Sequence, residues 1–226
     1  QTFKRDSMKV YGHGVSDMKG GDVIILFALK ALREAGVLKN TQIIVAFSGD
    51  EEKAGDPVSI SRKDLIKAAK RSDIALGFEG AIGLNYATVA RRSSGSWSVE
   101  TSGVRAHSAG VFTEDVGAGA IYEMSRILNS FYVELPEQNL TFNAATIVGG
   151  TLVDFDDTQS KGSAFGKNNI VSQKAIANGD IRCLTEEQIN NTVEKMKAIV
   201  AKNLPKTSAS ITFDLKYPPM APTPGN

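Results

Sequence analysis

The sequence predicts an α/β protein that combines a central, mainly parallel sheet flanked by helices with an inserted ferredoxin-like α+β domain. Short β-branched runs alternate with amphipathic helices in residues 1–91, which is typical of buried parallel strands. Residues 92–217 follow the order β-α-β-β-α-β of the split, ferredoxin-like motif, and we expect residues 218–226 to return to the first domain. With 226 residues, 42% of them hydrophobic, the chain is long enough for one large core or two modest cores.

The first domain is predicted to contain two helices and two strands. Apolar residues recur at helical spacing from Asp22 until Gly36 ends the pattern. The β-branched run 42–48 and the shorter apolar run 73–78 are expected to be buried strands. Between these runs, Ser61 is expected to cap a second helix.

Acidic residues lie where these elements end. Asp17 precedes the first helix, Glu51 and Glu52 follow the first strand, and Glu79 follows the second. The carboxyl ends of parallel strands meet at one edge of a sheet, where ligands bind. Carboxylates that converge there raise one another's pKa unless a cation lies among them, so a metal site is expected. Since Glu51 and Glu52 point to opposite sides, one can face the metal and the other the substrate.

Other interpretations of these segments were considered. The Asp-Glu-Glu sequence could be a solvated acidic turn. A phosphate-binding loop around Asp17 is disfavoured, because the Gly-x-Gly-x-x-Gly and Gly-Lys-Ser/Thr patterns are absent and the aspartate would repel phosphate. Oxygen ligands alone suit Mg²⁺ or Ca²⁺, whereas a histidine would favour Zn²⁺. His13 could be such a ligand or an exposed polar side chain.

The second domain alternates strands and helices. Thr185 and Gln188 form a capping box for its second helix. The polar segment 149–172 is expected to be a long surface loop. Strands are expected at residues 94–101, 140–148, 174–182 and 208–217, and helices at residues 117–131 and 186–203.

Composition excludes several classes of function. A net charge of +1 gives no electrostatic footprint for nucleic acid. No apolar stretch approaches the roughly 18 residues of a membrane helix, so we expect a soluble protein, of the cytoplasm or of a periplasmic or secreted compartment. The single cysteine, Cys183, excludes an internal disulfide and a thiolate metal cage and is expected to be buried and inert.

Several short motifs, taken together, resemble the dizinc metallopeptidases of the glutamate carboxypeptidase, aminoacylase and succinyl-diaminopimelate desuccinylase type. They run in the family's order along nearly the whole chain. The motifs are Gly14–Gly21, Ser48–Glu52, Phe78–Glu79, Ala106–Gly110, Gly149–Gly150, Asn169–Val171, Asp180–Arg182 and the closing Pro-Pro-Met-x-Pro-Thr.

The resemblance implies specific roles in the metallopeptidase domain, residues 1–91. Asp17 would bridge two Zn²⁺ ions, which Co²⁺ or Mn²⁺ could replace. Glu52 and Glu79 would each bind one ion, and Glu51 would be the general base. The reaction implied is hydrolysis of an amide bond beside a free carboxylate, as in a carboxypeptidase, a dipeptidase or an N-acyl-amino-acid deacylase.

The resemblance also makes residues 92–217 a lid that pairs two subunits into a homodimer. His107 would be catalytic, reaching the partner's site to stabilise the developing oxyanion, and would bind substrate with Asn169 and Arg182. Two further metal-binding histidines of the family are expected outside this stretch, so we expect a piece of a longer protein that is inactive alone. Arg182 could instead only pair with Asp180, and Asn169 could only cap a turn. The alternative function is a non-catalytic, dimerising member with an incomplete metal site.

Overall fold

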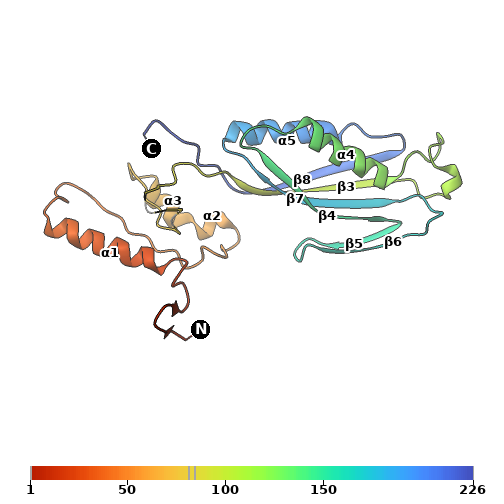
Figure 1. The fold of residues 1–226 in the computed structure, drawn as a ribbon. Helices are drawn as coiled ribbons and strands as arrows, with labels where there is room; N and C mark the ends of the chain where they lie inside the picture. The colour runs from red at the N-terminus through yellow and green to blue at the C-terminus, as the bar shows by residue number, and fades with distance from the viewer. Residues whose placement is uncertain (1, 81, 84, 226) are drawn as a thin grey trace. The chain divides into compact units, whose positions relative to one another are not determined.

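The computed structural model divides the chain into two compact units, Gln1–Ala87 and Thr88–Asn226 (Figure 1). The structure describes residues 2–80, 82–83 and 85–225. We call the unit Gln1–Ala87 the N-terminal unit and the unit Thr88–Asn226 the C-terminal unit. Together they make a mixed α/β protein, as the sequence predicts at this level.

The C-terminal unit is built on a four-stranded antiparallel sheet in the order β4-β7-β3-β8. Helices α4 (Ala120–Glu134) and α5 (Glu186–Val200) pack on one face of this sheet (Figure 1). Along the chain, the strands of this sheet and its two helices follow one another as β3, α4, β4, β7, α5 and β8, which is the predicted β-α-β-β-α-β order, with the first and third strands in the middle. The elements are β3 (Ser94–Gly103), α4 (Ala120–Glu134), β4 (Thr141–Gly150), β7 (Lys174–Arg182), α5 (Glu186–Val200) and β8 (Thr207–Tyr217), with a short 3₁₀ turn η1 (Ser108–Gly110) before α4.

A hydrophobic core lies between the sheet and its helices. Residues of β7 alternate between buried and half-buried positions, as expected for a strand with one face on the core. Trp97 on β3 and Phe131 on α4 meet edge to face, with ring centroids 5.7 Å apart. A Cβ atom at Gly179 would lie 1.6 Å from the carbonyl oxygen of Asn143 and 2.6 Å from the Trp97 ring. Glycine is therefore required where these strands and the indole meet.

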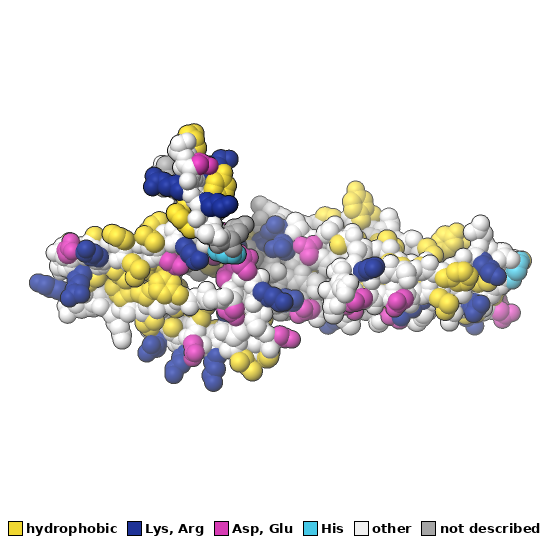
Figure 2. All heavy atoms as spheres, turned by 90° about the horizontal axis from the view of Figure 1, so that it is seen from below, with side chains coloured by type: hydrophobic (Ala, Val, Ile, Leu, Met, Phe, Trp, Pro, Cys, Tyr) yellow, Lys and Arg dark blue, Asp and Glu magenta, His cyan; other side chains and the backbone are white. Residues whose placement is uncertain are grey.

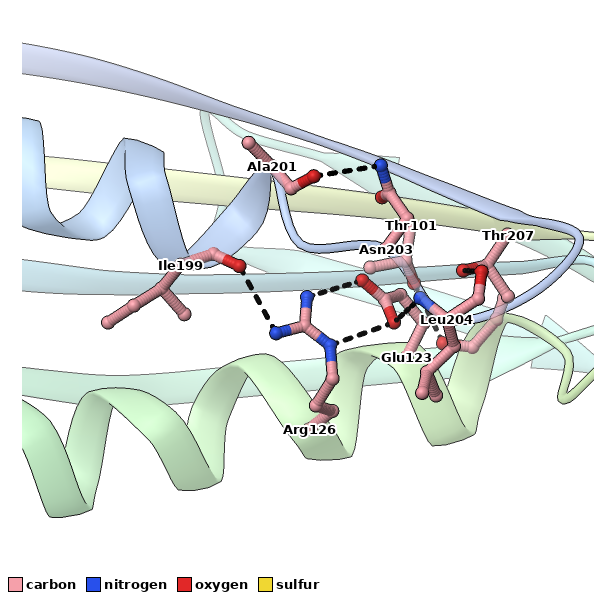
Figure 3. Close-up of polar contacts among 9 residues, drawn as sticks. Thr101, Glu123, Arg126, Ile199, Ala201, Asn203, Leu204 and Thr207 are labelled. Carbon is pink, nitrogen blue, oxygen red and sulfur yellow. Dashed lines mark hydrogen bonds and ion pairs between the residues drawn. The ribbon is translucent and has the colours of Figure 1, made fainter.

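A buried ion pair joins α4 to the end of α5 (Figure 3). Glu123 is fully buried and accepts hydrogen bonds from Arg126 Nε at 3.0 Å and Arg126 Nη2 at 2.6 Å. It also accepts from the backbone N–H of Leu204 at 3.0 Å. Arg126 Nη1 donates to the carbonyl of Ile199 at 3.1 Å. The pair thus bonds to a carbonyl in the last turn of α5 and to a backbone N–H in the segment that follows the helix.

The predicted cap of α5 is present in a shifted form. The backbone N–H of Gln188 donates to Thr185 Oγ1 at 3.0 Å, as expected for the first half of a capping box. The side-chain oxygen of Gln188, however, accepts from the backbone N–H of Leu184 at 2.9 Å. The reciprocal bond therefore reaches one residue further back than the motif predicts.

The segment predicted as a long surface loop contains a β-hairpin. Strands β5 (Leu152–Asp156) and β6 (Lys161–Phe165) pair antiparallel, so the loop prediction for 149–172 was wrong there. The turn is shaped by Asp156, whose carboxylate accepts from the backbone N–H and the hydroxyl of Thr158 at 2.9 and 2.6 Å. Asp154 and Asp156 in β5 and Gly162 in β6 hid the strand pattern, because Asp and Gly are depleted in strands.

The N-terminal unit contains a two-stranded ribbon and three helices. These are β1 (Lys4–Arg5), β2 (Val10–Tyr11), α1 (Lys19–Glu34), α2 (Val58–Ser61) and α3 (Lys63–Ala69).

Helix α1 confirms the predicted helix and begins three residues before Asp22. The helix is closed after its C-cap Ala35 by Gly36, with φ of +69°, and the Val37 N–H is bonded to the Leu32 carbonyl at 3.3 Å, which is a Schellman cap. Ser61 does not cap a helix, because it is the last residue of α2.

The predicted parallel sheet is not present among the described residues, where every sheet is antiparallel. Segments 42–48 and 73–78 are not assigned as strands. A strand is defined by hydrogen bonds to a neighbouring strand. The two segments and α1 line a cavity of about 690 Å³.

Hydrophobic side chains are exposed across the N-terminal unit, and Figure 2 shows them gathered on its surface, at the left of the view. None of its described residues is buried. On α1 the exposed fractions of Ile24 and Phe27 are 59% and 68%. The hydrophobic core of the described chain therefore belongs to the C-terminal unit.

The structure also bears on the cysteine and on the hydrophobicity of the helices. Cys183 is buried, as predicted, and burial raises the pKa of its thiol. None of the helices in the described part of the chain combines the length and hydrophobicity that a bilayer crossing requires.

Candidate active site

Four acidic residues of the N-terminal unit lie in electrostatic contact. Asp17 lies just before α1, Glu51 and Glu52 follow segment 42–48, and Glu79 follows segment 73–78. The pKa of Glu52 is raised, first by the charge of Asp17, then by that of Glu51, and further by Glu79. A hydrogen bond from Glu52 to Asp17 acts in the same direction. Three separate segments thus bring like charges together.

The chemistry of this cluster suits a divalent cation. Carboxylates that raise one another's pKa are stabilised in their charged form by a cation among them. However, no three His, Cys, Asp or Glu side chains within the described ranges are close enough together to hold a metal ion. The residues therefore have the right donor type but not the closed geometry of a metal site. His13, the other candidate ligand, is exposed in the loop ahead of Asp17.

The turn that carries Glu51 and Glu52 is fixed by Asp50. Its carboxylate accepts from Ser48 Oγ at 2.8 Å and from the backbone N–H of Gly55 at 3.2 Å. Arg62 Nη1 also donates to it. These three donors, Ser48 first, hold the pKa of Asp50 well below its usual range. Glu51 and Glu52 lie exposed between the two ends of the turn.

His107 and Asn169 are neighbours in the C-terminal unit. The Asn169 carbonyl accepts from the Ser108 N–H at 2.9 Å, and His107 forms a β-bridge with Ile170. His107 Nδ1 accepts from the Ala109 N–H at 3.1 Å. A neutral imidazole that accepts at Nδ1 carries its proton on Nε2. The exposed His107 ring can therefore donate a hydrogen bond from Nε2.

Arg182 lies at the opposite end of the sheet from these two residues. It is the last residue of β7, whereas His107 and Asn169 lie beyond the first, Lys174. Eight steps along a strand span about 26 Å. Arg182 Nε donates to Asp180 Oδ2 at 3.2 Å, with both side chains nearly half exposed. The pairing with Asp180 considered from the sequence is thus present, and the structure does not bring Arg182 to His107.

Sequence reasoning missed Arg62. Its guanidinium donates to the side chain and the backbone carbonyl of Asp50, the residue before Glu51. The adjacent Asp50-Glu51-Glu52 run was visible in the sequence, but a contact across twelve residues leaves no local pattern.

Comparison with known proteins decides the family. A family model for peptidase family M20/M25/M40 matches residues 2–223, which is nearly the whole chain. The chain belongs to this peptidase family. The resemblance drawn from the motifs is therefore confirmed. The M20/M25/M40 chain is also similar to carboxypeptidase G2 from Pseudomonas sp. (strain RS-16). The two are 29% identical over 213 residues, covering 92% of this chain and 46% of the relative. The chain thus spans about half the length of that relative.

Solved structures are also similar to this M20/M25/M40 chain. Aminopeptidase PepT from Bacillus cereus is 20% identical, with a TM-score of 0.45 over 61% of this chain and 33% of that protein. An aminobenzoyl-glutamate utilization protein from Klebsiella pneumoniae is 18% identical, with a TM-score of 0.44 over 60% of this chain and 31% of that one.

Proposed function

We propose that the full-length protein containing this chain is a metal-dependent hydrolase of an amide bond next to a free carboxylate. Its substrates would be small peptides or N-acyl amino acids. The observation that carries this proposal is the contact among Asp17, Glu51, Glu52 and Glu79, four carboxylates from three segments whose charges raise the pKa of Glu52. Membership of a peptidase family supports it.

Asp17, Glu52 and Glu79 are the residues that would hold two Zn²⁺ ions. Such ions supply a water that loses its proton near neutral pH. Glu51 would accept that proton and return it to the leaving amine. Two histidine ligands outside this stretch would complete the set.

In the C-terminal unit, residues 92–217 would act as a lid over the substrate. His107 would donate from Nε2 to the oxygen on which negative charge develops, which is typically worth about 3 kcal/mol for one donor. Asn169, held beside it through the Ser108 N–H, would bind the same part of the substrate. Arg182 presents a planar fork that suits the terminal carboxylate, and Asp180 holds it in place.

The proposed lid also suggests a homodimer. His107 and Arg182 lie at opposite ends of one sheet, so one subunit cannot present both to one small substrate. A second copy would let His107 serve the neighbour's site while Arg182 serves its own. The apolar face of α4, where Tyr132 and Val133 are 76% and 65% exposed, beside the edge strand β4, offers a surface for pairing.

A second candidate function is that of a non-catalytic, dimerising member of the family. It is favoured by one observation: the described carboxylates are not arranged closely enough to bind a metal. This protein would keep the lid and its pairing surface without chemistry at the acidic cluster.

Substrate hydrolysis with and without metal separates the two candidates. The full-length protein would be stripped with a chelator and resupplied with Zn²⁺, Co²⁺ or Mn²⁺. A panel of N-acyl amino acids and dipeptides would be compared with the same compounds carrying a C-terminal amide. We expect metal-dependent release of the free amino acid, and much weaker activity on the amides. A purified dimer that binds no metal and cleaves none of the panel would support the non-catalytic candidate.

A further inference from the structure

Arg62 contacts the turn that carries Glu51 and Glu52 through both of its terminal nitrogens. Its Nη1 donates to Asp50 Oδ1, and its Nη2 donates to the Asp50 backbone carbonyl at 3.0 Å. Nη1 also lies 3.3 Å from Ser48 Oγ. The Arg62 side chain is only 12% exposed, so water competes weakly for these bonds. One guanidinium therefore binds both the side chain and the main chain of the residue that precedes Glu51.

Asp50 passes this constraint across the turn. Its second oxygen accepts from the Gly55 N–H at 3.2 Å, which closes the segment that contains Glu51 and Glu52. A Cβ at Gly55 would lie 3.1 Å from the Ser61 Cβ, so the far end of the turn also packs closely against the residue next to Arg62. Both ends of the turn are thus tied to the short helices that follow it.

We propose that Arg62, acting through Asp50, is a positioning residue that sets the direction in which Glu51 and Glu52 leave the turn. This inference rests on the proposed function, because it concerns how those two carboxylates are held toward metal and substrate. In this role neither Arg62 nor Asp50 needs to touch the metal or the substrate. Because Glu51 and Glu52 follow Asp50 directly in the same turn, a rotation of the Asp50 peptide would redirect both side chains.

The chemistry of the contact explains why arginine is needed. The planar guanidinium donates two parallel bonds, one to the carboxylate and one to the carbonyl, and stays charged at any relevant pH. A lysine at position 62 would keep the charge but would lose the fixed fork. An asparagine at position 50 would place an N–H₂ group where an oxygen now faces the Gly55 N–H or the Arg62 guanidinium, and either contact would be lost.

The test uses Arg62→Lys and Asp50→Asn in the full-length protein. Matched controls are Arg33→Lys and Asp64→Asn, which make the same chemical changes at exposed positions of α1 and α3. Loss of partners that orient metal-binding side chains lowers metal affinity or activity by about tenfold to hundredfold. We expect both test variants to lose kcat and Co²⁺ affinity in this range, with KM nearly unchanged, while the controls match the wild type. Thermal unfolding would show whether each variant is folded.

The outcomes separate this inference from the proposed function. If Glu51→Gln is inactive while Arg62→Lys and Asp50→Asn keep full kcat and Co²⁺ affinity, the positioning role is wrong and the proposed function stands. If the full-length wild type shows no metal-dependent hydrolysis of any amide substrate, the proposed function itself fails. If Arg62→Lys does not fold, Asp50→Asn decides, since it removes the turn-closing acceptor by an isosteric change.

Discussion

At the scale of single residues, the acidic cluster depends on the different environments of adjacent carboxylates. Asp50 is held ionised by three donors, whereas the pKa of Glu52 is raised by neighbouring negative charges. Glu51 lies between these two residues and contributes to the raised pKa of Glu52. Adjacent residues with different environments can take different chemical roles. In this turn Asp50 would hold the backbone in place, Glu51 would be the general base and Glu52 would be a metal ligand.

Replacing Glu51 by glutamine tests the role of the base. The amide keeps the shape of the side chain and removes the proton acceptor, so we expect kcat of the full-length enzyme to fall by at least about 10²-fold. Metal content and thermal stability should stay at the wild-type level. Steady-state kinetics on a cleaved N-acyl amino acid, with metal measured in the same sample, give the answer. Unchanged turnover in metal-loaded Glu51→Gln would assign the base to another residue.

At the scale of elements, the helices of the C-terminal unit are joined by polar groups as well as by the core. The Glu123–Arg126 pair bonds to Leu204 and Ile199, and so ties α4 to the end of α5. A buried pair of this kind costs little when both partners are replaced by apolar groups, but removing one partner leaves an uncompensated charge.

Glu123→Gln should therefore lower the free energy of unfolding by about 3 kcal/mol. The double variant Glu123→Met with Arg126→Met should be much closer to the wild type. Glu194→Gln is the matched control, because Glu194 and Lys197 form an exposed i,i+3 pair on α5 worth at most about 1 kcal/mol. Denaturant unfolding followed by fluorescence of the single tryptophan, Trp97, reports on this unit. Equal losses of unfolding free energy in Glu123→Gln and Glu194→Gln would contradict the stabilising role of the Glu123–Arg126 pair.

The start of α5 should make stability depend on pH. The pKa of Glu137 is lowered, chiefly by a hydrogen bond from the Gln188 side chain at 2.6 Å, with help from Lys195. A carboxyl group whose pKa is lower in the folded state stabilises the protein above its ordinary pKa, and this contribution is lost as the pH falls through the folded value. The stability difference between wild type and Glu137→Gln should therefore be largest near neutral pH and shrink in acid. Glu134→Gln, at a nearby exposed position, serves as control, and a difference independent of pH would refute the linkage.

Elements of the C-terminal unit could be predicted from the sequence because their signals are local. The alternation in β7 and the Thr185 cap of α5 need no knowledge of distant residues. The parallel sheet could not be predicted correctly, because pairing depends on neighbouring strands that a β-branched run does not identify. The hairpin β5–β6 was missed because its strands are only five residues long and contain Asp and Gly, which are depleted in strands. In the candidate site, the acidic residues could be found from the sequence because they lie at the ends of their segments. The contact of Arg62 with Asp50 could not, because it joins residues twelve positions apart.

At the scale of the whole molecule, the separation of His107 from Arg182 is the feature with the clearest consequence. His107 lies beyond the Lys174 end of β7 and Arg182 is the last residue at its other end, and the strand between these ends spans about 26 Å. If both serve catalysis on a small substrate, they must act on two different sites in a symmetric pair of subunits.

Mixed dimers test this arrangement directly. His107→Ala and Glu51→Gln should each be inactive as full-length homodimers. In a mixed dimer, one site would receive an intact His107 from one subunit and an intact Glu51 from the other, so part of the activity should return. Purified heterodimers carrying two different affinity tags would be assayed against both parents. Verified mixed dimers without activity would mean that His107 acts within its own chain or has no role in catalysis.

The most direct test of the central claim is the position of the bound metal in crystals of the full-length protein. Diffraction data collected on both sides of the zinc absorption edge would locate the ions independently of any assumed site. The account predicts two anomalous peaks roughly 3.5 to 4 Å apart. Asp17 should lie between them, and Glu52 and Glu79 should each place a carboxylate oxygen about 2.0 to 2.2 Å from one ion. Zinc bound elsewhere, or any of these three carboxylates directed into solvent in the metal-loaded protein, would contradict it.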